Sequence, residues 1–248
     1  MNNPCLSIVT ITFNAAATLE RTIRSVEQQD YSNIEYIIVD GASTDGTLSI
    51  VSAHSHSISK CISEPDDGLY YAMNKGLQMA TGQYIWFLNA GDEIATPSTV
   101  SQMFASAPNA DVYYGDTTMT NMNGEEIGDR RLAPPEILTW RSFRKGMLVS
   151  HQSFVPRIAL CQPYDTRYHF SADFDWCINI LKQSQNVANT HIVLSRFLDG
   201  GITKHNIVAG LKERFRIMTH HYGLLRTVLC HIPIAIKFFY FWATKGRF

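Results

Sequence analysis

Residues 84–93, YIWFLNAGDE, begin as an apolar strand and stop at a turn that presents an amide and two carboxylates, Asn89, Asp92 and Glu93. Oxygen atoms of this kind bind Mg²⁺ and Mn²⁺, which need only one or two protein carboxylates when phosphates supply further ligands. Acids in such turns also cap helices, and we expect that role, or a solvent-facing position, for Glu93. The turn by itself fits either a cation site or a plain strand-to-helix loop.

Three earlier strands are also predicted to end in polar residues. The strands are 6–13, 34–40 and 57–63, and the residues at their ends are Thr12 with Asn14, Asp40, and Glu64 with Asp66 and Asp67. Helical segments alternate with these strands, which predicts right-handed crossovers and a mostly parallel sheet. Ligands bind outside the carboxyl ends of strands in such sheets. The four polar clusters therefore mark one edge of the sheet as the candidate active site.

The pattern is less regular after about residue 110. Expected there are a strand at 111–116, a hairpin about Asn123-Gly124, a strand at 151–157, a helix at 171–183, a strand at 186–198 and helices from about Asn206. No linker-like stretch divides the two halves. We predict one continuous α/β domain followed by a C-terminal helical tail.

Composition excludes several classes of protein. Hydrophobic residues make up 45% and charged residues 17% of the 248, which is typical of a soluble globular chain. The five cysteines are scattered and form no Cys-x-x-Cys pair, which argues against a disulfide framework and a structural zinc site. The first residues lack the basic segment and cleavage site of a secretory signal, so we expect a cytosolic protein.

Each polar cluster has a plain alternative when taken alone. VDGASTDGT lacks both the Gly-x-Gly-x-x-Gly spacing and a P-loop lysine, so Asp40 could contact a base or ribose, or simply end a strand. Asp66 and Asp67 suit the positive end of the helix that follows them. Lys75 could reach a phosphate, or remain solvated.

Four segments together carry a family resemblance. LSIVTITFN, IIVDGASTDGT, SEPDDGLYYAMNKG and YIWFLNAGDE, in this order and spacing, resemble family 2 glycosyltransferases of the GT-A fold, above all bacterial enzymes of O-antigen and colanic-acid polysaccharide synthesis. The resemblance covers roughly residues 5–205. It implies a Rossmann-like, mostly parallel sheet flanked by helices, and an inverting transfer from a nucleotide-sugar with a divalent cation, Mn²⁺ or Mg²⁺.

The resemblance also implies roles for single residues in the donor half. Thr12 and Asn14 would line the nucleotide pocket, and Asp40 would contact the base. Asp67 and Lys75 would lie near the uridine and phosphates. UDP is favoured as the nucleotide only because it is common in the family.

The turn at residues 89–93 matches the family's Asp-x-Asp region with two departures. Asn89 replaces the first acid, and Gly91 stands where another acid often occurs. Asp92 takes the metal-ligand place, so coordination would rest on this one carboxylate with diphosphate and water, and weak metal affinity is expected.

SADFDW (171–176) resembles the family's catalytic-base segment, with Asp173 at the position of the base and Asp175 as a neighbouring acid. An acceptor hydroxyl must lose its proton as it attacks the anomeric carbon, and a positioned carboxylate can take that proton. If Asp173 were only an acid at a helix N-terminus, Asp173→Asn would cost modest stability and nothing else.

Three further residues are candidate contacts to donor or acceptor. His151 and Gln152, in SHQSF, are expected near the same edge of the sheet, although a buried structural histidine fits His151 equally well. Lys204, in DGGITKH, would approach a phosphate if that glycine-containing loop closes over the donor.

The charge of the chain is unevenly distributed. Residues 204–248 hold eight basic side chains and one acidic one, a net charge of +7, which leaves −8 for the rest because the whole chain carries −1. The tail is also rich in Phe, Ile and Leu but is interrupted by Arg226, Pro233 and Lys237, so it suits an in-plane membrane helix better than a spanning one. A terminal helix packed on the domain is the alternative. Nucleic acid is a less suitable partner, because the basic excess is confined to this apolar tail.

Together these patterns predict a GT-A domain over residues 1–222, with a nucleotide-sugar-binding half (1–110) and an acceptor-binding half (111–222), and a membrane-associating tail (223–248). The predicted enzyme acts at the cytoplasmic face of the inner membrane on a sugar linked to polyprenyl diphosphate, as in O-antigen-like synthesis. A nucleotidyltransferase, or a non-catalytic protein that binds nucleotide-sugars or glycans, is the alternative. The absence of a glycine-rich basic loop after the first strand weighs against the nucleotidyltransferase.

Overall fold

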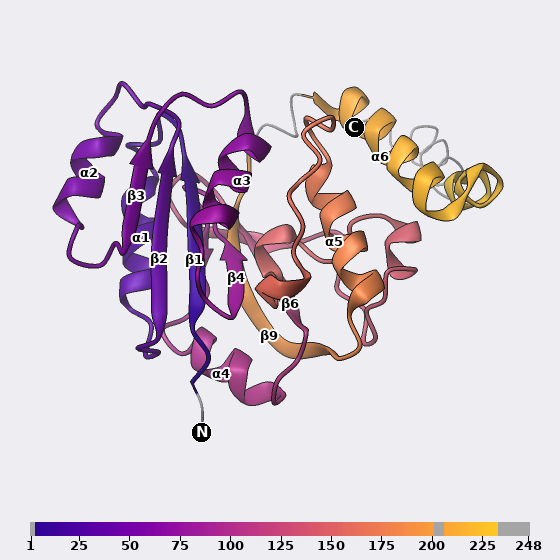
Figure 1. The fold of residues 1–248 in the computed structure, drawn as a ribbon, viewed down its shortest axis with the longest axis horizontal. Helices are drawn as coiled ribbons and strands as arrows, with labels where there is room; N and C mark the ends of the chain where they lie inside the picture. Colours follow the sequence, from indigo (N-terminus) through magenta and orange to yellow (C-terminus); the bar gives the residue numbers. More distant parts are fainter. Residues whose placement is uncertain (1–2, 201–205, 233–248) are drawn as a thin grey trace.

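The four strands of the first half form one parallel sheet in the order β3-β2-β1-β4 (Figure 1). The computed structural model describes residues 3–200 and 206–232. The bounds of the strands are β1 Leu6–Thr12, β2 Ile34–Asp40, β3 Lys60–Ser63 and β4 Tyr84–Phe87. In register, Asp40 is the partner of Thr12 on one side and of Ser63 on the other. The predicted polar ends of three strands are therefore level with each other.

Alternating side chains give this sheet two apolar faces. The intervening helices are α1 Leu19–Glu27, α2 Thr47–Ala53 and α3 Leu69–Met79. Ile8 and Trp86 pack with Ile23 of α1 on one face, whereas Val9 and Phe87 pack on the other face with α3 and with α5, Ala172–Gln183. Strands β1, β2 and β4 thus bury both of their faces, as their nearly continuous apolar sequences require. Strand β3, at the end of the sheet, is partly exposed.

A second, mixed sheet lies beside the first. Its strands are β5 Glu93–Ile94, β6 Val112–Thr120, β7 Glu126–Asp129, β8 Phe154–Pro156 and β9 Val187–Leu198. Strand β6 pairs parallel with β9 and antiparallel with β7 and β8. A bridge between Tyr84 and Arg157 joins the two sheets. The predicted hairpin is present, since Asn121 N–H donates to Glu125 O at 3.0 Å.

The remaining helices all follow β5 along the chain. They are α4 Thr99–Ser106, α6 Ile207–Tyr222 and the 3₁₀ turns η1 Ser142–Lys145, η2 His151–Ser153 and η3 Ile158–Leu160. Figure 1 shows α5 and α6 on the side of the molecule away from α2. Residues 224–232 form a further helical stretch. Lys204 and tail residues 233–248 lie outside the described residues.

The α/β architecture predicted from the sequence is confirmed, with three local differences. The third strand begins at Lys60 rather than at residue 57, and residues 151–153 are a 3₁₀ turn rather than strand. Glu93 does not cap a helix: it lies in β5, and its carboxylate is 3.5 Å from Arg21 Nε. The N-cap position of α4 is Ser98.

Candidate active site

Hydrogen bonds around Asp40 join the loops after β1 and β2. The buried carboxylate of Asp40 accepts hydrogen bonds from the backbone and hydroxyl of Ser43 and from the hydroxyl of Ser63. Asn14 N–H donates to Ser43 Oγ at 2.8 Å, and Asn14 Oδ1 accepts from Thr44 N–H at 2.9 Å. The structure therefore brings Asn14 and Asp40 together on one edge of the sheet.

Two buried oxygen atoms of uncharged side chains at this edge lack a hydrogen-bond partner within residues 3–200 and 206–232. They are Thr12 Oγ1, at the end of β1, and Asn89 Oδ1, in the turn after β4. Ala90 N–H donates to Ile11 O at 3.0 Å, which holds that turn beside β1. Burying a polar atom without a partner costs free energy, so both oxygens suit contact with a bound polar ligand.

Asp92 ends the turn, where its N–H donates to Asn89 O at 2.9 Å, and is only 3% exposed. Its Oδ1 accepts a hydrogen bond from Leu198 N–H at 3.0 Å, and the side chain of Gln152 also bonds the carboxylate. Burial raises the pKa of Asp92 to about 7, although these bonds and the charge of Arg21 oppose the rise. A cation or an added hydrogen-bond donor would favour the charged form.

Gly91 is explained by the shape of the turn. Its φ is +101°, and a Cβ there would lie 2.6 Å from Leu198 Cδ2. Arg21 Nη2 donates to Gly91 O at 3.0 Å, and Gly91 N–H donates to Thr22 Oγ1 at 2.8 Å. The backbone at this position is therefore fixed in the left-handed region, where an aspartate would be strained and would contact Leu198.

His151 belongs to a buried aromatic cluster. Its ring packs against Phe87 and Trp176, and a hydrogen bond of 2.7 Å joins its Nε2 to Tyr164 Oη. Burial lowers the pKa of His151, although the charge of Asp173 acts in the opposite direction. A neutral, enclosed imidazole is suited to packing, so the structure favours the structural alternative. The adjacent Gln152 contacts Asp92, which links this cluster to the turn after β4.

Asp173 is held from both halves of the chain. Tyr70 Oη, on α3, donates to Asp173 Oδ1 at 3.1 Å, and Phe174 N–H donates to the same oxygen at 2.9 Å. Within the described residues Oδ2 accepts no hydrogen bond. Tyr70 also stacks on Tyr164, with ring centroids 5.6 Å apart. Asp173 is thus connected with Asp92 by a series of contacts: Tyr70 contacts Tyr164, Tyr164 contacts His151, and Gln152, next to His151 in the sequence, contacts Asp92.

The segment after β3 uses Lys75 within the protein. Lys75 Nζ lies 2.7 Å from Glu64 Oε1 and 2.5 Å from Asp66 Oδ1. A phosphate would have to compete with both carboxylates for this ammonium group. Asp67 instead lines a pocket of about 220 Å³ at the start of α3, together with Tyr70.

Asp175 lies away from the edge of the sheet, on the contact between α5 and α6. Its Oδ1 accepts a 2.7 Å hydrogen bond from His221 Nε2, and its Oδ2 accepts one from Asn179 at 2.8 Å. Lys182 Nζ approaches His221 Nδ1 at 2.7 Å, so the imidazole is bonded on both sides. The role expected from the sequence, a contact to donor or acceptor, finds no support in this position.

A model of glycosyl transferase family 2 matches residues 7–162, more than half of the chain. The chain belongs to this family. It is 30% identical over 222 residues to a Mycobacterium bovis (strain BCG / Pasteur 1173P2) protein named PGL/p-HBAD biosynthesis glycosyltransferase, and the match covers 84% of this chain and 82% of that protein. Membership in the family and this relative identify the chain as a glycosyltransferase.

Two solved structures share the fold. Staphylococcus aureus TarS 1–349 in complex with UDP gives a TM-score of 0.67 at 16% identity, over 98% of this chain and 74% of that one. Mannosyltransferase PcManGT from Pyrobaculum calidifontis, in complex with GDP-Man and Mn²⁺, gives 0.68 at 16% identity, over 100% of this chain and 77% of that one. The GT-A arrangement predicted from the sequence is thus confirmed as the fold.

The oxygens at the turn fit a divalent cation only in part. In the described ranges, no three His, Cys, Asp or Glu side chains cluster in a way that could hold a metal. The unpartnered Asn89 Oδ1 and the carboxylate of Asp92 are nevertheless hard oxygen donors on the same turn. Mg²⁺ and Mn²⁺ sites often consist of one or two protein oxygens completed by substrate phosphates and water. The fit is therefore that of a site completed by the nucleotide.

Sequence reasoning missed two residues that position the site. Tyr70 comes three residues after the last acid of SEPDDG, but its contact with Asp173 spans 103 residues and leaves no local signal. Glu213, on α6, accepts hydrogen bonds from His169 N–H and Phe170 N–H, each at 2.9 Å. The sequence does single out Glu213, because it is the one acidic residue among the basic residues of segment 204–248.

Proposed function

We propose that this glycosyltransferase inverts configuration as it moves a sugar from a nucleoside diphosphate-sugar to a hydroxyl of a lipid-linked glycan, in the synthesis of a bacterial surface polysaccharide such as O-antigen. The observation that carries the proposal is the support of Asp173 by Tyr70. A carboxylate on the acceptor side is thereby tied to a helix of the donor side, with Oδ2 left to take a proton.

The chemical step needs a base for the acceptor hydroxyl and stabilisation of the negative charge on the departing diphosphate. The acceptor oxygen attacks the anomeric carbon, the bond from that carbon to the diphosphate oxygen breaks, and the hydroxyl proton passes to Asp173 Oδ2. Attack from the face opposite the leaving group inverts the anomeric configuration. Tyr70 and Phe174 N–H occupy Oδ1 and so fix which oxygen faces the acceptor.

The donor is assigned to the edge formed by Thr12, Asn14, Asp40 and Asn89. The unpartnered oxygens of Thr12 and Asn89 support a polar ligand there. We propose UDP as the nucleotide, supported by the UDP complex of TarS. GDP is the alternative, supported by the GDP-Man complex of PcManGT. Asp92 and Asn89 would hold a divalent cation. Such a cation would neutralise charge that develops on the departing diphosphate.

The proposed contact with a membrane, where a lipid-linked acceptor would lie, is argued from the C-terminal residues. Within helical residues 224–232 five aliphatic side chains are exposed: Leu224, Leu225, Val228, Leu229 and Ile232. Basic residues of segment 204–248 accompany them, which is the composition of an in-plane helix at an anionic membrane. No helix in the described residues is long and apolar enough to cross a membrane. Within this proposal we assign donor binding to residues 1–110, acceptor binding to 111–222 and membrane contact to 223–248.

The test is a panel of nucleotide-sugars, each with and without Mn²⁺, scored by thermal unfolding of the full chain. A ligand that binds only the folded state raises the melting temperature, so one nucleotide class should protect, and more strongly with the cation. Product analysis of the protecting donor should then show free nucleoside diphosphate. Release of pyrophosphate would indicate nucleotidyl transfer and contradict the proposal, as would protection without any turnover.

A further inference from the structure

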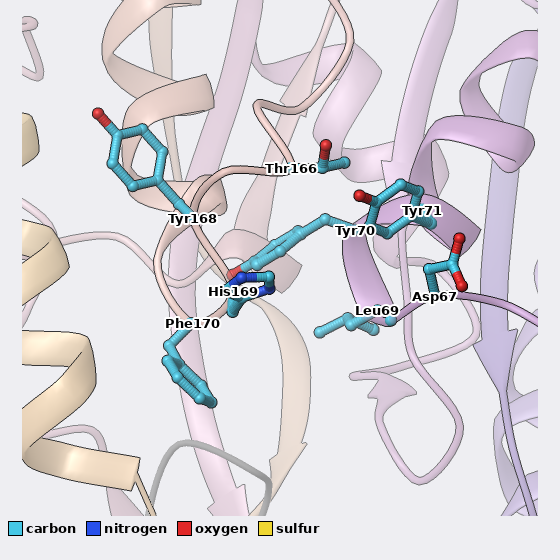
Figure 2. Close-up of a pocket in the computed structure, with 9 residues that line it drawn as sticks. Asp67, Leu69, Tyr70, Tyr71, Thr166, Tyr168, His169 and Phe170 are labelled. Atoms are coloured by element: carbon cyan, nitrogen blue, oxygen red, sulfur yellow. The ribbon is translucent and has the colours of Figure 1, made fainter.

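A pocket of about 220 Å³ lies between the start of α3 and the loop that leads into α5 (Figure 2). Residues 67–71 form one wall, and Thr166 with residues 168–170 form the other. Figure 2 shows Tyr70 reaching from α3 toward the loop that carries His169. The pocket therefore spans the boundary between the donor half and the acceptor half.

The lining of this pocket has the chemistry of a saccharide site. Tyr71, Tyr168 and Phe170 offer aromatic surface, and Tyr71 is 38% exposed. Asp67 and Thr166 add oxygen atoms that can form hydrogen bonds with the hydroxyl groups of a ligand. A pyranose ring has an apolar face of C–H bonds and a rim of hydroxyls, so it can use both kinds of group.

The same lining argues against a phosphate-bearing ligand. None of the nine lining residues is a lysine or an arginine, and Asp67 brings a carboxylate that would repel a diphosphate. The nucleotide and the diphosphate of a lipid carrier are thus poorly suited to this position, which leaves the uncharged sugar part of the acceptor.

One lining residue connects the pocket to the reaction. Tyr70 borders the pocket and donates to Asp173 Oδ1 at 3.1 Å. Asp173 itself does not line the pocket, so a saccharide there would be separated from the proposed base by the side chain of Tyr70. That position suits a sugar unit next to the one that reacts.

The second wall is held from outside the segment that matches the family model, which ends at residue 162. Glu213 on α6 is 8% exposed and accepts the N–H groups of His169 and Phe170, each at 2.9 Å. Ser171 Oγ also donates to Gly210 O at 3.3 Å. Glu213 and Gly210 of α6 thus hold the backbone of the second wall in place.

We propose that this pocket binds a sugar unit of the acceptor glycan, adjacent to the reacting one, and that Glu213 is a positioning residue for its wall. The proposal rests on the proposed glycosyl transfer for its biological role. Binding of a saccharide in the pocket is a property that can be measured without turnover.

The probes are octyl glycosides of glucose, galactose, N-acetylglucosamine and rhamnose, observed by saturation-transfer NMR with the full chain, with and without UDP. At least one glycoside should bind the wild type. Tyr71→Ala and Tyr168→Ala should each weaken that binding roughly tenfold through loss of aromatic contact. Leu48→Ala on α2 is the matched control, because Leu48 is 39% exposed and Tyr71 is 38% exposed. It should bind the glycoside as the wild type does.

Glu213→Gln keeps the shape of the side chain but offers one acceptor oxygen where the carboxylate offers two. It should weaken glycoside binding severalfold while the dissociation constant of UDP changes less than twofold. Equal losses of glycoside and UDP affinity in Glu213→Gln would indicate a general structural role and overturn its assignment.

The remaining outcomes separate the two proposals. Absence of binding by any of the four glycosides, or unchanged binding in Tyr71→Ala and Tyr168→Ala, overturns the saccharide site. Loss of UDP affinity in these tyrosine variants assigns the pocket to the donor and overturns it as well. Glycoside binding that depends on the tyrosines, in a protein that binds no nucleotide-sugar, supports the pocket and contradicts only the proposed function.

Discussion

Tyr70 on α3 donates a hydrogen bond to Asp173 on α5, with 3.1 Å between Oη and Oδ1. The contact crosses from the first half of the chain to the second, over 103 residues of sequence. It leaves one carboxylate oxygen for chemistry and fixes the orientation of the other. Removing either partner should therefore affect the reaction more than the fold.

Tyr70→Phe removes the hydroxyl but keeps the ring that stacks on Tyr164. We expect kcat to fall about tenfold, which corresponds to losing one positioning hydrogen bond of about 1.4 kcal/mol to a charged group. The KM for the donor should change little, because the donor edge is untouched. Steady-state kinetics with varied donor will show the effect, and an equal change in kcat and donor affinity would contradict a role confined to Asp173.

Asp173→Asn should abolish acceptor-dependent transfer, with a loss of about 10²- to 10⁴-fold, because an amide cannot take the hydroxyl proton. Asn Oδ1 can still accept from Phe174 N–H, so the start of α5 should persist. Donor affinity, measured by calorimetry, should match the wild type. Asp175→Asn, two residues further on, is the control: it should lose stability through the His221 contact but keep transfer. Normal turnover in Asp173→Asn would refute the base assignment.

Restoring the family's acid at position 91 should not strengthen the cation site. Gly91→Asp places a side chain at φ +101° and against Leu198, and it buries a second carboxylate beside Asp92. We expect a loss of roughly 1–3 kcal/mol in the free energy of unfolding. Gly128→Asp is the control, because Gly128 has φ +128° with nothing within 4 Å and so reports the backbone strain alone. A Gly91→Asp protein as stable as wild type, with tighter Mn²⁺ binding, would show that the turn is adaptable.

The edge of the first sheet was predictable because its signals are local. Apolar runs that stop at polar residues mark the ends of parallel strands, and parallel strands bring those ends to one side. Thr12, Asn14, Asp40 and Asn89 accordingly lie at one edge. The position of Asp173 at the start of a helix was predictable for the same reason, because the signal lies in the neighbouring sequence.

The contacts that decide each role were not predictable, because they depend on tertiary approach. Lys75 is engaged by Glu64 and Asp66 in a turn whose geometry no spacing rule specifies. Asp175 is bonded to His221 from a helix that comes 46 residues later. The sequence identifies which side chains are chemically able to act, while packing decides which of them are already engaged.

Burial of Asp92 makes stability depend on pH. Its pKa is raised from 3.8 to about 7 in the folded protein, so the folded state binds the proton more tightly than the unfolded state. The stabilising contribution is present below about pH 4 and is lost as the pH rises toward 7. Asp92→Asn removes this dependence while keeping an acceptor for Leu198 N–H.

Denaturant unfolding of both proteins at pH 5 and pH 8 provides the measurement. The difference between Asp92→Asn and wild type should shift in favour of the variant by roughly 2–4 kcal/mol between these pH values. Other titrating groups cancel in this double difference. Mn²⁺ should add to the stabilisation by UDP in the wild type, and more at pH 8 than at pH 5, whereas in the variant UDP should stabilise equally with and without Mn²⁺. A pH-independent difference between the two proteins would mean that Asp92 is not buried as described.

Two helical glycines should respond to alanine with opposite signs. Gly76 on α3 faces β1 so closely that a Cβ would lie 2.4 Å from Val9 Cγ1, whereas at Gly210 on α6 the nearest atom would be 3.7 Å away. Gly76→Ala should therefore lower the free energy of unfolding by roughly 1–3 kcal/mol through overpacking. Gly210→Ala should be neutral or raise it by up to about 1 kcal/mol, because alanine favours the helix. Denaturant midpoints at one pH will compare them. A Gly76→Ala protein as stable as Gly210→Ala would mean that α3, which carries Tyr70, is free to shift on the sheet, and the fixed geometry between Tyr70 and Asp173 would no longer follow from packing.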